Sequence, residues 1–318
     1  MSYATAARVP ETEIAADLTI SVVVPVRDEP GALRRLIAAL GAQTLPRERF
    51  EILVGDDGST DPSIRSIATR DGWIRVASGD PLTSYAARNR ASSLAQAPAL
   101  AFCDADCRPE PNWLEAGLAA LESANLVAGL IRFIPPERPT VWTLLDMDTF
   151  LDQERAVRAG RAVTANLFVR RELFERVGGF DETLPNTGDY DFVSRCVAAG
   201  AALTYTPTAV VWHPTRDSSR AFLGKVWAVN RRYAARESRA GRRPEALRAR
   251  SWVPAVQTFR GRRRFGRPIG LDGRRLATSG VRVSAWANLR ALPIVYLLVP
   301  YLAVIAQLLG RRDGRRLR

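Results

Sequence analysis

The chain is poor in the residues that build metal clusters and disulfide frameworks. Among its 318 residues it has one histidine, His213, and three cysteines, Cys103, Cys107 and Cys196. A single histidine excludes a metal site made from several histidines. Three cysteines cannot all pair within one chain, so we expect a reducing compartment and no disulfide framework. Because Cys103 and Cys107 have no second cysteine pair to join, we interpret them as packing residues.

Lysine is almost absent, although the chain is strongly basic. Lys225 is the single lysine among 46 basic residues, and the formal net charge is +13. Residues 216–318 hold 24 Arg and one Lys against five acidic residues, a balance of +20, which leaves −7 for residues 1–215. Such a basic segment favours anionic membrane lipids as a partner. An arm that binds nucleic acid is the alternative, but the acidic part of the chain would repel phosphate backbones, so nucleic acid is the less favoured partner.

Long apolar runs are also scarce. Residues 1–17 have no apolar core, so we interpret them as an N-terminal extension without a secretory signal peptide. Ala291–Leu309 has 19 residues with Gln307 as its one polar side chain, which is just enough to span a bilayer. Arg290 precedes this run and five arginines follow it, so the positive-inside rule gives no clear orientation. A helix lying at the membrane interface and a buried soluble helix therefore stay open as alternatives to a spanning anchor.

Short apolar runs alternate with helical patterns over the first part of the chain. Buried strands are predicted at 18–26, 50–54, 73–77, 99–103 and 126–131, with helices between them that include 84–97 and 111–123. This alternation predicts an α/β fold with a mostly parallel sheet and helices on both faces. Beyond residue 132 the alternation weakens, and we expect helices at 140–158, 171–177 and 189–199 and strands at 162–169, 202–206 and 210–212.

Polar clusters follow the first, second and fourth predicted strands. They are Arg27-Asp28-Glu29, Asp56-Asp57-Gly58-Ser59 and Asp104-Ala105-Asp106. Ligands of parallel α/β sheets bind beyond the carboxyl ends of the strands. Because acidic clusters gathered at one edge repel each other, we expect a bound cation there.

Six motifs in order resemble family 2 glycosyltransferases. They are Val-Val-Val-Pro-Val-Arg-Asp-Glu (22–29), Val-Gly-Asp-Asp-Gly-Ser-Thr-Asp (54–61), Ala-Arg-Asn (87–89), Phe-Cys-Asp-Ala-Asp (102–106), Gly-Gly-Phe-Asp-Glu (178–182) and Gly-Asp-Tyr-Asp (188–191). The resemblance covers roughly residues 18–214 and implies the GT-A fold, a nucleotide-sugar-binding α/β sheet. It also implies an inverting enzyme of the hexosyltransferase class, which moves a sugar from a UDP- or GDP-linked donor to a hydroxyl acceptor.

The resemblance also suggests a division of the chain. The catalytic domain would be 18–215, with a nucleotide-binding half at 18–131 and an acceptor half at 132–215. An Arg-rich, partly helical segment would follow at 216–284, and a membrane-anchor helix with a basic tail at 285–318. We expect this anchor to hold the enzyme at the cytoplasmic face of the cell membrane. The acceptor would then be a lipid-linked or glycan hydroxyl in cell-envelope, polysaccharide or glycolipid synthesis.

The resemblance assigns the metal to the third cluster. Asp106 would be the main metal ligand, and Asp104 would also face the metal while leaning toward the ribose. Two residues apart in an extended segment, their carboxylates face the same way, and such oxygen ligands suit Mg²⁺ or Mn²⁺. His213, within Trp-His-Pro, would help hold the metal or the diphosphate, although a purely structural histidine is an equal alternative.

The nucleotide would be bound by residues of the first two clusters and of the predicted helix at 84–97. By resemblance, the contacts are Pro25, Arg27, Glu29, Asp56, Asp57 and Arg88. Asp57, with Asp56 beside it, would accept a hydrogen bond from the nucleobase. The alternative for Asp57 is a turn residue that caps the next helix, and the alternative for Arg88 is a solvated helix arginine.

Two aspartates are candidates for the catalytic base. Aligning Asp191 and Arg195 with the family's downstream acid and arginine places Asp189 at the base position, with Gly188 where glutamate is usual. An ionised carboxylate there can accept the proton of the acceptor hydroxyl. A helix N-cap is the alternative for Asp189, and Asp191 is the second candidate for the base.

Two other classes of protein were weighed. A basic membrane- or nucleic-acid-binding protein could carry a GT-A domain that has lost its activity. A sugar-phosphate nucleotidyltransferase needs a glycine-rich loop with a lysine near the start of the chain, whereas the single lysine here is Lys225. Glycosyl transfer is therefore the preferred interpretation.

Overall fold

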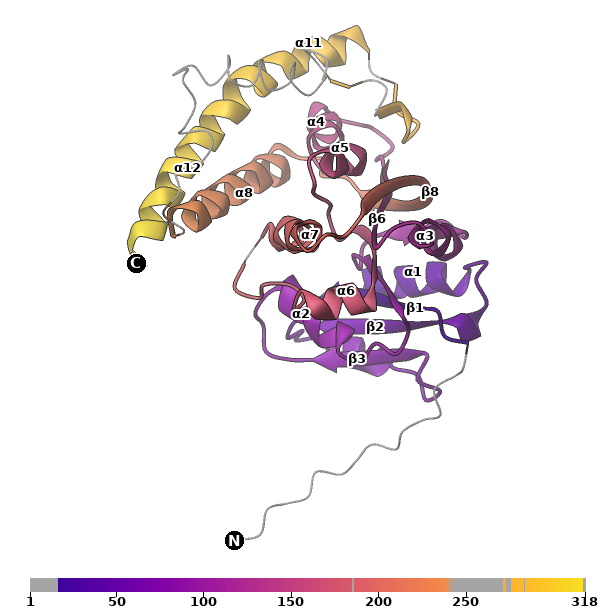
Figure 1. Ribbon diagram of the computed structural model, residues 1–318. Helices are drawn as coiled ribbons and strands as arrows, with labels where there is room; N and C mark the ends of the chain where they lie inside the picture. The colour runs from indigo at the N-terminus through magenta and orange to yellow at the C-terminus, as the bar shows by residue number, and fades with distance from the viewer. Residues whose placement is uncertain are drawn as a thin grey trace.

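The computed structural model describes residues 17–184, 186–239, 241, 271–272, 276–282 and 284–316. Its centre is an eight-stranded sheet with the order β3-β2-β1-β4-β7-β6-β8-β5 (Figure 1). The strands are β1 (Ile20–Val26), β2 (Phe50–Asp56), β3 (Ile74–Ser78), β4 (Ala99–Cys103), β5 (Arg108–Pro109), β6 (Leu126–Ile134), β7 (Asn166–Arg170) and β8 (Leu203–Pro214). The main helices are α1 (Pro30–Gly41), α2 (Ser84–Ser92), α3 (Trp113–Leu121), α4 (Val141–Thr149), α5 (Gln153–Arg158), α6 (Arg171–Arg176), α7 (Gly188–Ala198), α8 (Ser219–Arg239), α11 (Ala285–Pro293) and α12 (Val299–Arg316).

The α/β class is confirmed, and the sheet is mixed. Strands β1 to β4 pair in parallel, as do β6 and β8, whereas β7 runs antiparallel to both of its neighbours. Continuous apolar strands are what a parallel sheet covered on both faces requires, and every residue of β1 and β2 is buried. The carboxyl ends of β1, β2 and β4 therefore meet at one edge, where the three polar clusters follow them.

Strand β8 is longer than the sequence predicts. The expected strands at 202–206 and 210–212 form one strand, which pairs with β6 through an irregularity between Gly129 and Leu130. The buried Asn166 side chain connects the two strands at this irregularity. Its Nδ2 donates to the carbonyls of Leu130 and Ala209, both at 2.9 Å. Its Oδ1 accepts a hydrogen bond from the indole of Trp113 at 2.9 Å. All polar atoms of this side chain are satisfied, and β8 can continue to the edge where His213 lies.

Three predicted helix and strand boundaries are wrong. The helix expected over 140–158 is two helices, α4 and α5, because Leu151 adopts a left-handed conformation with φ 58° and the Asp152 carboxylate caps α5. Helix α2 ends at Ser92 rather than at residue 97, where the hydroxyl of Ser93 bonds the carbonyl of Arg90 instead of continuing the helix. Strand β7 begins at Asn166 rather than at residue 162.

The C-terminal region forms a helical layer beside the sheet. Figure 1 shows α8, which follows β8, lying alongside α12, and α11 lying near α4. Ala285–Asp313 is one continuous apolar rod long enough to cross a membrane. It bends where Pro293 is followed by a π-helical turn at Ile294–Leu298, since both features interrupt the regular hydrogen-bond ladder. Much of the Arg-rich segment expected at 216–284 lies outside the described residues.

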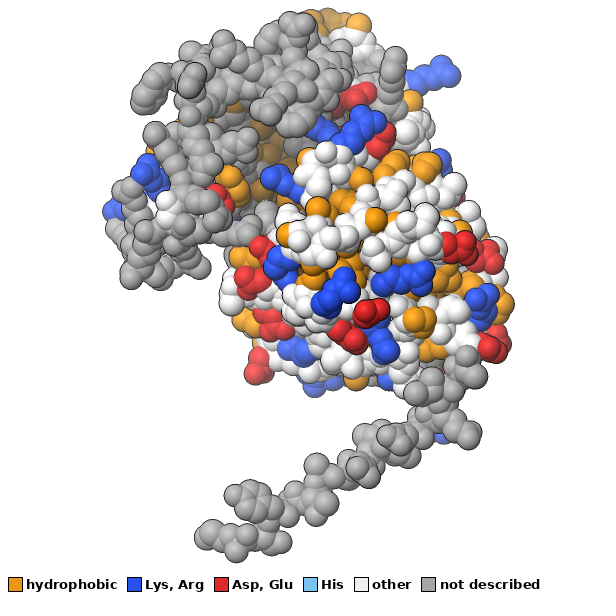
Figure 2. Space-filling model, viewed as in Figure 1, with side chains coloured by type: hydrophobic (Ala, Val, Ile, Leu, Met, Phe, Trp, Pro, Cys, Tyr) orange, Lys and Arg blue, Asp and Glu red, His pale blue; other side chains and the backbone are white. Residues whose placement is uncertain are grey.

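The surface of the catalytic domain carries no broad field of one sign on the face shown in Figure 2. Acidic and basic side chains alternate there between uncharged areas. The net negative charge counted over residues 1–215 is therefore not gathered into one acidic patch on this face.

Candidate active site

A cavity of about 280 Å³ lies at the carboxyl ends of β1, β2 and β4. It is lined by Pro25, Val26, Arg27, Glu29, Asp57, Ser84, Arg88, Asp104, Ala105 and Asp106. Seven of the residues assigned from the sequence are among them. The four other candidates, Asp56, Asp189, Asp191 and His213, are not in the lining and are placed individually below.

The loop after β1 is fastened to the loop after β2. Asp28 adopts a left-handed conformation with φ 51°, and its Oδ1 accepts hydrogen bonds from the amide and hydroxyl of Thr60 at 2.7 and 2.9 Å. The amide of Asp28 donates to the hydroxyl of Ser59 at 3.0 Å. The hydrogen bonds from Thr60 lower the pKa of Asp28. This contact fixes Arg27 and Glu29, which flank Asp28, at the rim of the cavity.

Asp56 points into the turn and not into the cavity. Its carboxylate is fully buried, accepts the amide of Ser59 at 2.8 Å and lies 3.6 Å from Nε of Arg65. Burial alone would raise the pKa of Asp56, but the hydrogen bonds from Ser59 outweigh it and the pKa is lowered. The geometry therefore gives Asp56 a structural part in shaping the Asp-Asp-Gly-Ser turn, which differs from the nucleotide contact that we expected.

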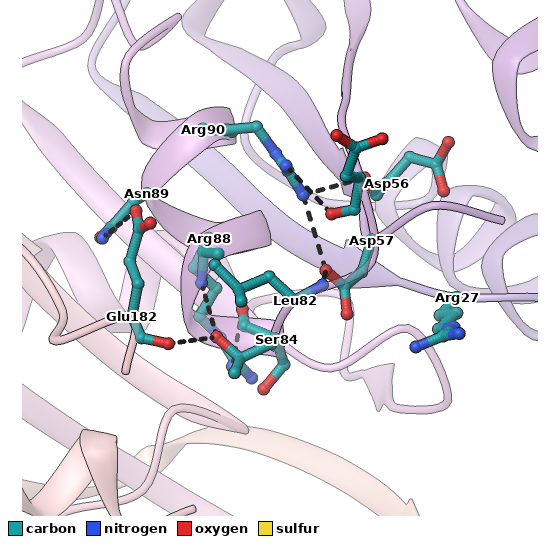
Figure 3. A network of polar contacts seen from close by, with 12 residues as sticks. Arg27, Asp56, Asp57, Leu82, Ser84, Arg88, Asn89, Arg90 and Glu182 are labelled. Carbon is teal, nitrogen blue, oxygen red and sulfur yellow. Dashed lines mark hydrogen bonds and ion pairs between the residues drawn. The ribbon is translucent and has the colours of Figure 1, made fainter. Parts of the chain in front are cut away.

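Asp57 lines the cavity and is held by two groups. Its Oδ1 accepts the amide of Leu82 at 2.9 Å and lies 3.6 Å from Nη2 of Arg90. The same Arg90 nitrogen donates to the carbonyl of Asp56 at 3.2 Å, so one guanidinium bridges the two aspartates (Figure 3). Arg90 was missed from the sequence because a helix arginine is usually solvated.

Arg88 is a buried cation paired with Asp104. Its side chain is 5% exposed and its Nη2 lies 2.5 Å from Oδ1 of Asp104. A second nitrogen donates to the carbonyl of Ser84 at 3.3 Å. Burial of an arginine is costly unless the charge is paired, so the alternative of a solvated helix arginine is wrong for Arg88.

Gly55 allows α2 to bring Arg88 to the cavity. A Cβ at Gly55 would lie 2.1 Å from the carbonyl oxygen of Ala87, which is shorter than any non-bonded contact. We therefore expect Gly55→Ala to push α2 away from β2, to lower the unfolding free energy by about 1–3 kcal/mol and to weaken nucleotide binding. Chemical denaturation and nucleotide titration measure these effects. Gly224→Ala is the control, because a Cβ there meets open space, and an equal loss in both variants would contradict the packing argument.

Asn89 connects two of the motifs. Its Nδ2 donates to the carbonyl of Phe180 and to the carboxylate of Glu182, both at 2.9 Å, and its Oδ1 accepts the amide of Phe180 at 2.9 Å. Gly179, with φ 64°, passes so close that a Cβ would lie 2.8 Å from Oδ1 of Asn89. The Ala-Arg-Asn and Gly-Gly-Phe-Asp-Glu motifs therefore form one structural unit.

Asp106 and His213 face each other across the end of β4 and β8. Nε2 of His213 lies 3.9 Å from Oδ1 of Asp106. Nδ1 of His213 lies 2.6 Å from the carbonyl of Pro214, an acceptor, so Nδ1 carries a proton. In the neutral ring the lone pair is then on Nε2, which is the nitrogen that faces Asp106.

The surroundings of Asp106 suit a cation. Burial raises the pKa of Asp106, and the neighbouring Asp104 raises it further, whereas His213 opposes the shift. Cys107 belongs to the same group of potential ligands, whose atoms lie within 4.8 Å of one another. The pKa of Cys107 is held well above its usual value by a hydrogen bond with Cys103 and by burial, which favours the thiol over the thiolate that binds metals. One carboxylate and one imidazole fit a divalent cation that keeps further positions for phosphate and water.

Asp189 lies in the first turn of α7, close to the cavity. The N-cap of α7 is Thr187, with φ 60°, so the alternative of an N-cap at Asp189 is wrong. Its Oδ1 accepts the amide of Tyr190 at 2.9 Å and lies 3.5 Å from the hydroxyl of Tyr85. Although Asp189 keeps some solvent contact, the protein surrounds it closely, and this burial raises its pKa; the charge of Asp104 adds to the shift.

Gly188, which the resemblance aligns with the family's usual glutamate, packs closely against Tyr85. A Cβ at Gly188 would lie 2.7 Å from the ring of Tyr85. The tyrosine occupies the space that a larger side chain at 188 would need, and its hydroxyl reaches Asp189 from there.

Asp191 has a structural partner instead of a free approach to the cavity. Its Oδ2 lies 2.9 Å from Nε of Arg195. Arg195 in turn donates to the carbonyls of Val177 and Gly179, both at 2.6 Å. This arrangement ties α7 to the loop that follows α6. Asp189 is accordingly the better placed of the two candidates for the base.

Two basic residues beyond the motifs lie beside the site. The backbone amide and the guanidinium of Arg216 bind the buried carboxylate of Asp146 at 3.0 and 3.1 Å. Burial lowers the pKa of Lys225, and the positive charge of Arg216 adds to this effect, whereas Asp104 and Asp189 oppose it. Lys225 thus lies within electrostatic range of both aspartates. Being the only lysine was the one signal in the sequence.

The sheet, its strand order and a cavity at the carboxyl ends of β1, β2 and β4 define a GT-A transferase fold. Among solved structures, the mannosyltransferase PcManGT from Pyrobaculum calidifontis, in complex with GDP-Man and Mn2+, superposes with a TM-score of 0.58 at 17% identity, covering 92% of this chain and 85% of that one. S. aureus TarS 1-349, in complex with UDP-GlcNAc, gives 0.53 at 15% identity, covering 95% and 92%.

The chain belongs to glycosyltransferase family 2. The family model described as Glycosyl transferase family 2 matches residues 21–178. Glycosyltransferase AglE of Haloferax volcanii is 32% identical over 204 residues, which cover 62% of this chain and 67% of AglE. The pre-mycofactocin glycosyltransferase of Mycobacterium tuberculosis is 28% identical over 222 residues, covering 65% of this chain but 45% of that protein. The sequence-based recognition of the family and of the enzyme class is confirmed.

Proposed function

We propose that the enzyme transfers a sugar, with inversion, from a UDP- or GDP-linked donor to a hydroxyl acceptor. The observation that carries this proposal is the arrangement of charged groups: several of them line the cavity, and a carboxylate that could act as a base lies beside it. Asp57, Arg88, Asp104 and Asp106 line it, and the half-buried carboxylate of Asp189 lies close by on α7. The structural neighbours bound to UDP-GlcNAc and to GDP-Man support both donor types.

The cavity residues divide between nucleobase, ribose and diphosphate. Asp57 would accept a hydrogen bond from the base, along which Pro25, Arg27 and Glu29 would lie. Asp104 would face the ribose, held in position by Arg88. A divalent cation held by Asp106 and His213, Mg²⁺ or Mn²⁺, would stabilise the charge that develops on the departing diphosphate.

Asp189 would act as the general base. Its carboxylate would take the proton of the acceptor hydroxyl while that oxygen attacks the anomeric carbon and the bond to the diphosphate breaks. Attack from the face opposite the leaving group inverts the configuration at that carbon. The hydroxyl of Tyr85, 3.5 Å away, would orient the carboxylate, and Asp191 would support α7 through Arg195.

The C-terminal region bears on where the enzyme acts and therefore on which acceptor it meets. We propose a catalytic domain over 18–215, followed by a basic segment and an apolar anchor helix at the cytoplasmic face of the membrane. The acceptor would be a lipid-linked or glycan hydroxyl of the cell envelope, and nucleic acid is not expected as a partner. Support comes from the charge balance of +20 beyond residue 215 and from the apolar helix at Ala285–Asp313.

A panel of nucleotide sugars tests the proposal directly. The full-length protein is incubated with UDP- and GDP-linked hexoses, each with Mg²⁺, Mn²⁺ or chelator. We expect cation-dependent release of the nucleoside diphosphate and a raised melting temperature for one donor class. Melting temperatures unchanged by every donor, together with no hydrolysis, would contradict the proposed reaction.

The raised pKa of Asp189 predicts an acid limb in the rate profile. The base must be ionised, so kcat should fall as the pH is lowered through this raised pKa, which lies above the value of about 4 of an ordinary aspartate. Tyr85→Phe removes a donor to the ionised carboxylate and should move the limb to still higher pH. Steady-state rates across the pH range measure both effects, and an acid limb in the parent enzyme at or below the ordinary aspartate value would exclude Asp189 as the base.

A further inference from the structure

The apolar rod formed by α11, the π-helical turn and α12 has two different faces. Its buried face includes Ala291, Val295, Ala306 and Gln307. The opposite face carries eight large apolar side chains that are 38% to 69% exposed: Trp286, Leu289, Leu297, Leu298, Tyr301, Ile305, Leu308 and Leu309. Most of these follow each other at three- or four-residue spacing, so they form one continuous stripe along the rod.

The beginning of the rod is fixed to the catalytic domain. Ala291 and Val295 are part of a buried cluster that includes Leu144 and Leu145 of α4 and Phe222 of α8. Figure 1 shows α11 lying near α4. The N-terminal end of the apolar run is therefore packed against the catalytic domain.

The C-terminal end of the rod is packed against α8. Gln307 donates to the side chain of Asn230 on α8 at 2.8 Å, and Asp313 pairs with Arg231 at 2.8 Å. A Cβ at Gly310 would lie 1.9 Å from the carbonyl oxygen of Arg231, so the two helices touch through their backbones. If α12 crossed the membrane, it would have to separate from α8 or pull the arginines of α8 into the hydrocarbon core. Both outcomes are unfavourable.

Basic side chains accompany the stripe. Arg290 is exposed and lies over the ring of Trp286, with its Cζ 5.5 Å from the ring centroid. Arg312 is exposed near the other end. Tryptophan and tyrosine side chains favour the level of the lipid headgroups, and arginines there attract anionic lipids. An apolar face with aromatic residues and flanking cations complements an anionic bilayer surface.

We propose that α11 and α12 bind the surface of an anionic membrane with this stripe and do not cross it. The stripe enters the boundary between headgroups and acyl chains, the arginines bind the headgroups, and both ends of the rod remain on the side of the catalytic domain. The proposal is independent of the sugar that the enzyme transfers.

Vesicle sedimentation tests the surface. The full-length protein is mixed with vesicles of phosphatidylcholine alone or with one third phosphatidylglycerol, at low and high salt. We expect binding to the anionic vesicles that persists partly in 1 M salt, because apolar contact is not screened. The variant L297Q/Y301Q/I305Q/L308Q should bind about a hundredfold more weakly or worse with an unchanged melting temperature. Val197→Gln is the control, since Val197 is an exposed apolar residue of α7.

Labelling from the two sides of a membrane distinguishes a surface helix from a spanning one. Cysteine is introduced at Ala285 or at Arg312, both exposed, in a protein whose own three cysteines are buried. Inverted bacterial vesicles expose the cytoplasmic face of the membrane, so an impermeant maleimide should label both positions there. Spheroplasts expose the outer face, so neither position should be labelled in them. Labelling of one end in spheroplasts would overturn the proposal in favour of a spanning helix. If the protein instead stays in solution as a dimer, and the four-glutamine variant dissociates that dimer, the stripe binds a second copy of the chain and not a membrane.

Discussion

Replacement of Asp106 by alanine should abolish sugar transfer. Asp106 and His213 are the carboxylate and imidazole that face each other at 3.9 Å, and without Asp106 the diphosphate loses the cation that stabilises its developing charge. Burial raises the pKa of Asp106, so its removal should not destabilise the fold. Initial rates with saturating Mn²⁺ or Mg²⁺ measure the loss, and calorimetry measures cation binding.

The control for Asp106 is a nearby carboxylate with another task. Asp191→Asn weakens the pair with Arg195 and should alter thermal stability more than cation affinity. An Asp106→Ala enzyme that retained near-normal turnover in the presence of chelator would refute the metal assignment.

Replacement of Asp189 by asparagine should separate chemistry from donor binding. The amide has nearly the volume of the carboxylate but cannot accept the proton, so kcat should fall by about a hundredfold to ten-thousandfold. Donor affinity should be retained, because Asp189 is not among the residues that line the nucleotide cavity. Single-turnover rates and nucleotide titration measure the two quantities separately.

A stability measurement accompanies the Asp189 variant. Because the pKa of Asp189 is raised in the folded state, its ionised form disfavours folding above that pKa, and this penalty disappears as the pH falls below the unfolded value near 4. Asp189→Asn removes the penalty, so its melting temperature at neutral pH should equal or exceed that of the parent. A large loss of stability would show that Asp189 supports the fold and would weaken its assignment as base.

The parallel half of the fold was predictable because its strands are buried on both faces and so appear as continuous apolar runs. In α1 the three buried leucines, Leu33, Leu36 and Leu40, instead follow the three- and four-residue spacing of a helix packed on one face. The antiparallel course of β7 was not predictable, because a strand's direction depends on the path of the intervening chain and leaves no periodic signal. The break at Leu151 was hidden for a similar reason: the apolar pattern continues through a residue whose backbone turns left-handed.

The site was predictable where a motif follows a strand directly. Six of the seven assigned residues that line the cavity lie at or just after the end of a strand, and the seventh, Arg88, comes from α2. Their roles in the reaction stay predictions. Asp56 and Asp57 are adjacent in sequence, and only the fold shows that one side chain enters the turn while the other lines the cavity. Arg90, Arg216 and Lys225 were missed because they reach the site from helix faces and from the loop after β8, which are determined by tertiary packing.

Helix α8 begins just after the strand that carries His213 and lies against α12 further along. Neighbouring helices pack with their axes about 8–10 Å apart, so α8 would lie roughly one helix diameter above a membrane-bound α12. Lys225 on α8 lies within electrostatic range of Asp104 and Asp189, so the reacting groups would lie near α8 and therefore above the lipid as well. An acceptor hydroxyl would then have to stand roughly 10–20 Å above the acyl chains. A sugar joined directly to a glycerolipid would be too short to reach this height, whereas one carried on a diphosphate or on a short glycan would arrive at the base without leaving the bilayer.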